Sequence, residues 1–200
     1  MSKKAHRLYN IFEGYKLMFK AFKSMKIYSK ALKNNLISKE FSERIMLAVT
    51  DVNGCAMCSY AHTKMALEAG LDGDEIKKLL VGTFDDVPSE ELVAIMYAQH
   101  FAETRGFPSK KSKEDLIRTY GMEKSNAISA SINIIMMGNA YGIPLGSFLS
   151  RFKRSKATKR DSRSNPFYEV FMLLSVVVFF PFSFIQAFFA RLLKRPLIKA

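Results

Sequence analysis

The segment Cys55-Ala-Met-Cys58-Ser-Tyr-Ala-His62 contains both cysteines of this 200-residue chain and one of its three histidines. It follows Asn53-Gly54, a pair that predicts a turn, and one of these two residues is expected to cap a helix that begins there. On such a helix the two cysteines lie one turn apart on the same face, and His62 follows four residues later on that face. The segment therefore brings two thiols and an imidazole together on one helix.

Helical periodicity continues on both sides of this segment. Strict alternation of apolar and polar residues is almost absent, whereas apolar residues recur at the 3.6-residue period of a helix. Residues 7–33 predict a basic amphipathic helix that either packs on the domain or lies against lipid. Further helices are expected at about Ser38–Val52, Glu75–Gly82, Pro88–Gly106, Lys113–Tyr120 and Glu123–Met137. The sequence thus predicts an all-α protein.

Turn and cap residues mark the breaks between these helices. Gly70 is expected to end the cysteine helix, and Asp72 or Asp74 to begin the next one. The stretch from Gly138 to Gly146 contains three glycines and a proline, which predicts a loop or a broken helix. Residues 155–165, rich in Ser, Lys and Arg, are expected to form a linker.

The formal net charge of +13 is concentrated at the two ends of the chain. Residues 1–40 carry +8 and residues 151–200 carry +9, whereas residues 41–150 carry −4. Basic flanks beside an apolar segment are typical of contact with an anionic membrane surface, so no nucleic-acid partner is expected. We expect four parts: an N-terminal amphipathic helix at 1–33, a helical domain at 34–150, a basic linker at 151–166 and a hydrophobic segment at 167–200.

The hydrophobic segment includes 21 residues without a formal charge, from Val170 to Ala190, and seven of them are phenylalanines. As a helix, this run matches the roughly 20 residues needed to cross the hydrocarbon of a bilayer. Pro181 near its middle would kink a spanning helix or split it into a re-entrant hairpin. Two other interpretations are a bent amphipathic pair in the membrane interface and a hydrophobic arm in the interface of a soluble oligomer. Membrane attachment through residues 167–193 is favoured.

The compartment is expected to be the cytoplasm. Two closely spaced cysteines argue against a secreted disulfide scaffold. Lysines are interspersed among the first apolar residues, whereas a signal peptide has a continuous apolar stretch. Seven basic residues precede the apolar run between 151 and 163 and four follow it, which favours a cytoplasmic location for the main domain.

The location of the thiols favours redox chemistry. Amides and the positive dipole end of a helix stabilise a thiolate in its first turn. His62 is within reach of Cys58 as a proton acceptor, and Glu43 on the preceding helix is the acid expected to orient the imidazole. Two alternatives remain, a pair of small buried hydrophobic residues and a zinc site formed by Cys55, Cys58, His62 and Glu43.

Glu43, Cys55-x-x-Cys58-x-x-x-His62 and Gly70 together resemble the redox-active branch of the alkylhydroperoxidase D and carboxymuconolactone decarboxylase superfamily, over roughly residues 25–105. The resemblance implies a compact helical bundle, a homo-oligomer, and a thiol-dependent peroxidase or disulfide oxidoreductase. It implies that Cys58 attacks the peroxide and becomes a sulfenic acid, and that Cys55 resolves it to a disulfide. Glu43 and His62 match the proton relay of the family. Neither a cofactor nor a metal is implied, because an external dithiol restores the cysteine pair.

The chain departs from peroxidase-type relatives at Met57, where those proteins often have a histidine. Dithiol chemistry is therefore expected more strongly than efficient peroxide turnover. The expected partners are a peroxide or disulfide substrate, a thiol reductant (a protein or a small thiol) and a membrane surface. Two other functions remain as alternatives, a membrane-bound redox sensor or scaffold without multiple turnover, and a zinc-binding interaction module.

Overall fold

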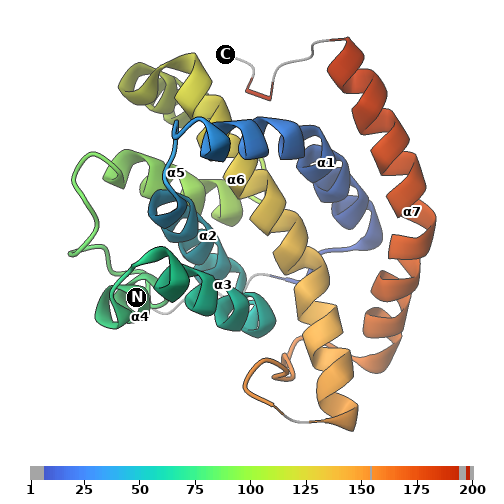
Figure 1. Cartoon of the computed structure of the whole chain (residues 1–200). Coiled ribbons are helices and arrows are strands. Elements are labelled where there is room, and N and C mark those ends of the chain that lie inside the picture. The colour runs from blue at the N-terminus through green and yellow to red at the C-terminus, as the bar shows by residue number, and fades with distance from the viewer. Residues whose placement is uncertain (1–6, 154, 194–196, 199–200) are drawn as a thin grey trace.

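The computed structural model describes residues 7–153, 155–193 and 197–198, and these residues form helices and no strand. The all-helical fold expected from the sequence is thereby confirmed. Helix α6 crosses the middle of the molecule, and α1, α2, α3, α5 and α7 all pack against it (Figure 1). The helices are α1 (Ile11–Lys33), α2 (Lys39–Asn53), α3 (Ala56–Ala69), α4 (Gly73–Leu79), α5 (Leu92–Glu103), α6 (Lys110–Phe152) and α7 (Pro166–Leu192).

Side-chain caps begin several of these helices. Ser38 caps α2 as expected, because its hydroxyl accepts a hydrogen bond from the Phe41 N–H. Asp72, rather than Asp74, caps α4. Helix α1 begins at Ile11 and not at residue 7, since Asn10 and Glu13 form a reciprocal capping box at that point. Helix α5 begins at Leu92, four residues after the expected start at Pro88.

Helix α6 departs most from the expected pattern. The helices expected at Lys113–Tyr120 and Glu123–Met137 are one element, kinked at Gly121, whose φ is 70°. The loop or broken helix expected at Gly138–Gly146 is wrong, because the helix continues through Pro144 to Phe152. This stretch is buried between other helices, and tertiary packing outweighs the low helix propensity of glycine and proline.

Helix α7 lies along one side of the molecule against α1 and α6 (Figure 1). It is one continuous helix through Pro181, so the re-entrant hairpin does not form. Aromatic pairs join it to α1: the ring centroids are 5.1 Å apart for Tyr15 and Phe179, and 5.0 Å apart for Phe22 and Phe180. Lys194, Arg195 and Lys199 of the expected basic flank lie outside the described residues.

Among the described residues, α6 and α7 are long and apolar enough to cross a membrane. In the most apolar window of α6, 61% of the residues are buried inside the protein, against 22% for α7. Helix α6 is therefore the central core helix of the bundle. Helix α7 instead exposes most of its apolar side chains.

Candidate redox site

Cys55 and Cys58 form a disulfide at the beginning of α3. Cys55 is itself the N-cap of α3, and its Sγ accepts a hydrogen bond from the Cys58 N–H at 3.2 Å. The expectation that Asn53 or Gly54 caps this helix is wrong. Gly54 has a left-handed backbone, with a φ of 72°, and ends α2, so that the chain reverses and α3 starts directly afterwards. Cys55 is fully buried and Cys58 is 7% exposed.

The other two expected site residues meet each other. Glu43, buried on α2, and His62, on α3, are joined by a hydrogen bond of 2.7 Å between Oε2 and Nδ1. A carboxylate at Nδ1 orients the ring and leaves Nε2 for exchange of a proton with another group. His62 is also one helical turn from Cys58. Four side chains chosen from the sequence are thus placed on two adjacent helices, α2 and α3.

Helix α6 packs against the disulfide at Gly142. This residue lies in the stretch where the sequence predicts a loop or a broken helix. A Cβ atom added to Gly142 would lie 2.7 Å from the Cys58 Sγ and 2.8 Å from the Cys55 Sγ. Real side chains essentially never approach so closely. Only glycine therefore lets α6 pack this close to the two sulfurs. One turn later Gly146 packs against Met57, the residue between the cysteines.

The end of α2, next to the disulfide, is held by residues far away in the sequence. The Tyr9 hydroxyl donates to the Asn53 Oδ1 at 2.7 Å, and the Arg163 guanidinium donates to the Asn53 carbonyl at 3.1 Å. Burial raises the pKa of Tyr9 to about 12, so its hydroxyl keeps the proton that it donates. Separations of 44 and 110 residues explain why no local sequence signal indicated these contacts.

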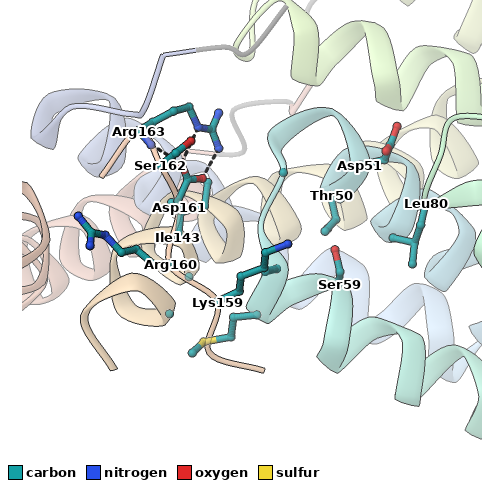
Figure 2. Close-up of a pocket in the computed structure, with 15 residues that line it drawn as sticks. Thr50, Asp51, Ser59, Leu80, Ile143, Lys159, Arg160, Asp161, Ser162 and Arg163 are labelled. Carbon is teal, nitrogen blue, oxygen red and sulfur yellow. Dashed lines mark hydrogen bonds and ion pairs between the residues drawn. The ribbon is translucent and has the colours of Figure 1, made fainter. Parts of the chain in front are cut away.

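A cavity of about 420 Å³ opens beside the disulfide (Figure 2). Gly142, which contacts both sulfurs, is part of its wall, as are Met57 and Ser59 of α3. The opposite wall is the loop between α6 and α7, from which Lys159 extends toward the side of Ser59 (Figure 2). The expected linker at 155–165 therefore covers the candidate site.

This loop is fixed by an internal ion pair and by a contact to α6. Burial by itself would raise the pKa of Asp161, but the hydrogen bonds and charge of Arg163 hold it below its usual value. The Asp161 N–H donates to the Ser147 hydroxyl at 3.0 Å. Asp161 is therefore neutralised within the loop.

Glu43 borders a different, smaller cavity of about 240 Å³, together with Tyr28 and Met65. Neither Glu43 nor His62 lines the cavity beside Gly142. The carboxylate–imidazole pair and the α6 side of the disulfide thus face different spaces.

The described residues contain no group of three or more His, Cys, Asp or Glu side chains that could hold a metal ion. The zinc site considered from the sequence would need such a group, and its two thiols are joined in the disulfide. The arrangement of these residues therefore favours dithiol chemistry over metal binding.

The helices that carry the candidate site also match a known protein family. Residues 18–96 match the model of the carboxymuconolactone decarboxylase family. This match confirms the resemblance to the alkylhydroperoxidase D-like superfamily, and it covers α2, α3 and α4 with all four candidate residues. Members of the family are often enzymes, either peroxidases or decarboxylases. No curated protein and no solved structure matches the chain.

Proposed function

We propose that this protein is a thiol-dependent oxidoreductase that acts on a peroxide or a disulfide in the cytoplasm, at a membrane surface. The hydrogen bond between Glu43 and His62, with His62 one helical turn along α3 from Cys58 of the disulfide, is the observation that carries the proposal. Assembly as a homo-oligomer belongs to the same proposal, by likeness to the family. Attachment to the membrane is through residues 167–193, and its support is the exposed apolar surface of α7.

In the peroxidase reaction, His62 takes the proton of the Cys58 thiol, and the thiolate attacks one peroxide oxygen. The O–O bond breaks, and the alcohol, or water in the case of hydrogen peroxide, leaves with the proton returned by His62. The resulting sulfenic acid reacts with the Cys55 thiol to form the S–S bond and release water. Two electrons thus pass from the two thiols to the peroxide. An external dithiol then reduces the disulfide by thiol–disulfide exchange. Cys58 is assigned the attack by likeness to the family, and it is also the more exposed of the two cysteine residues.

The first test is turnover of the full-length protein with hydrogen peroxide, cumene hydroperoxide or a small disulfide, in the presence of dithiothreitol. One equivalent of peroxide should remove both thiols of the reduced chain and lower its mass by two hydrogens. Cys58→Ser should abolish turnover. An active Cys58→Ser variant, or wild-type protein that turns over none of these oxidants, would reject the proposal.

The second test addresses Glu43, which acts as a positioning residue for His62. Glu43→Gln removes the charge that faces Nδ1, and we expect turnover to fall roughly 100-fold, within the usual range for general acid–base catalysis. The pH profile of turnover should also shift, which a purely structural defect would not cause. Glu68→Gln is the matched control, because Glu68 is an exposed carboxylate that lines the same cavity as Glu43. An unchanged profile in Glu43→Gln would contradict the relay.

A redox switch without multiple turnover is the second candidate, and a specific contact favours it. Arg163 in the loop that leads to α7 donates to the Asn53 carbonyl, two residues before Cys55. A backbone shift at Cys55 on reduction of the disulfide would therefore change this hydrogen bond between Asn53 and the loop. Oxidation that proceeds once per chain and changes the assembly state, without turnover, would favour this function over catalysis.

A further inference from the structure

The outer face of α7 is a continuous apolar surface on the described part of the protein. Phe167, Leu174, Val178, Ile185 and Leu192 are each more than half exposed and follow one another along this face. The inner face, with Met172, Ser183 and Ala187, is buried against the rest of the protein. An exposed apolar surface of this length marks an interaction site.

Contacts on the inner face determine how α7 can meet a membrane. Tyr168 donates to the Tyr9 carbonyl at 3.0 Å, and Tyr15 donates to Gln186 at 2.9 Å, so α7 is attached to α1 along its length. If α7 crossed a bilayer in this arrangement, α1 would cross with it and take its exposed lysines, Lys16 and Lys26, into the hydrocarbon, which is costly. Only the outer face of α7 is therefore free to enter lipid.

A cationic depression lies at the end of this surface, between α6 and α7. Its volume is about 720 Å³, and four cationic and three hydroxyl-bearing side chains line it. One of the four cations, Arg151, is paired with the Glu169 carboxylate. Lys156 and Lys159 are exposed in it and form no ion pair with a carboxylate of the described chain. Exposed phenylalanines flank the loop on both sides, Phe152 at the end of α6 and Phe167 at the start of α7. Cations next to exposed aromatic side chains match the headgroup and acyl regions of an anionic lipid.

We propose that α7 binds an anionic phospholipid surface in the plane of one leaflet, with its outer face among the acyl chains and the depression at Lys156 and Lys159 on the lipid phosphates. This inference rests on the membrane attachment included in the proposed function, and it excludes a transmembrane orientation. Its readout, lipid binding, is separate from thiol turnover, although Lys159 of the depression also lines the cavity beside the disulfide. In-plane helices of this kind insert roughly 5–10 Å, at the boundary between headgroups and acyl chains.

Depth of insertion provides the decisive test, because the natural chain contains no tryptophan. Single substitutions Phe167→Trp, Val178→Trp and Leu192→Trp place a fluorophore at the start, middle and end of the outer face. In vesicles of phosphatidylcholine and phosphatidylglycerol, with brominated lipids as quenchers, all three should show the same shallow depth. Val81→Trp is the control, since Val81 is exposed and lies just after α4, and it should not be quenched. Helix α4 lies on the other side of the molecule from α7 (Figure 1).

The possible results separate the alternatives. A spanning helix would place the fluorophore at residue 178 deepest and those at residues 167 and 192 near opposite surfaces. That result would overturn the in-plane orientation but not the attachment to the membrane. Absence of quenching at all three positions, as when a second copy of the chain covers the face, would overturn membrane attachment as well.

Charge reversal tests the lipid phosphate site. Lys156→Glu/Lys159→Glu should weaken partitioning onto the anionic vesicles about tenfold or more, with no change on neutral phosphatidylcholine vesicles. The matched control is Lys33→Glu/Lys39→Glu, which reverses two exposed lysines, one at the end of α1 and one at the start of α2, neither of which lines the depression. Equal effects of the two double variants would overturn the phosphate site and leave only general electrostatic attraction.

Discussion

At the scale of single residues, Gly142 has the sharpest structural requirement in the candidate site. Its Cα lies so close to the disulfide that an added Cβ would meet both sulfurs at less than 3 Å. Gly138, one turn earlier on the same helix, has no such restriction, because the nearest atom to its added Cβ is 3.7 Å away and belongs to Ile135. The two glycines therefore form a matched pair for mutation.

We expect Gly142→Ala to destabilise the oxidised protein by about 1–3 kcal/mol, the usual cost of overpacking a core. The effect should be smaller in the reduced protein, where the two sulfurs can move apart, so disulfide formation should also become slower. Gly138→Ala should instead stabilise the protein by about 0.5–1 kcal/mol, the usual gain from alanine in a helix. Urea unfolding of both redox forms measures these differences. Equal effects of Gly142→Ala on the two forms would show that α6 does not press on the disulfide.

At the scale of secondary structure elements, an ion pair between an exposed arginine and a buried carboxylate joins α6 to α7. Arg151 donates to Glu169 at 2.6 Å and 2.8 Å, and Ser164 adds a hydrogen bond of 2.9 Å. The side chain of Glu169 is fully buried. The hydrogen bond from Arg151 holds the pKa of Glu169 below its usual value. This carboxylate therefore stabilises the junction in its charged form.

Glu169→Gln should destabilise the protein at neutral pH by about 1–3 kcal/mol, because a hydrogen bond between charged groups is lost and Arg151 keeps a weaker partner. The native carboxylate contributes fully above the pKa of about 4.3 of an unfolded glutamate, and its contribution disappears as the pH falls through the lower native pKa. Wild type and variant should therefore converge in acid. Urea unfolding from pH 7 to pH 3 measures this, with Glu103→Gln on the exposed side of α5 as control. A constant difference across this range would contradict the assignment.

At the scale of the whole molecule, the segregation of charge follows the fold. The mildly acidic middle of the sequence includes α2 to α5 and most of α6, whereas the basic ends include α1, the loop after α6 and α7. Helices α1 and α7, which belong to the two basic parts of the sequence, pack on each other (Figure 1). The protein thus has a basic and apolar side distinct from the side that contains α4.

Binding to anionic vesicles should accordingly have a salt-sensitive part and a salt-resistant part. Raising sodium chloride from 0.05 to 0.5 M should weaken binding about tenfold or more, because exposed charges are screened. Binding should not vanish, since the apolar face of α7 does not depend on salt. Co-sedimentation with vesicles over a salt series measures both parts, and neutral vesicles provide the reference. Complete release at high salt would show that the apolar face stays outside the lipid.

The amino-acid sequence by itself determined the features that depend on neighbours along the chain. Helical periodicity and caps such as Ser38 and Gly70 are local, and they predicted an all-helical protein with most helices near their observed places. The spacing of Cys55, Cys58 and His62 also follows from one helix. Glu43 was found because the turn at Asn53-Gly54 folds two adjacent helices against each other.

Only the tertiary structure decided the features that depend on contacts between distant segments. Local propensity indicated a break at Gly138–Gly146, yet burial between helices keeps that stretch helical and places Gly142 against the sulfurs. The length and apolarity of α7 are compatible with a span, a hairpin or a surface helix. Packing of its inner face on α1 and α6 leaves a single continuous helix with one free apolar side, because side chains more than 150 residues apart meet there.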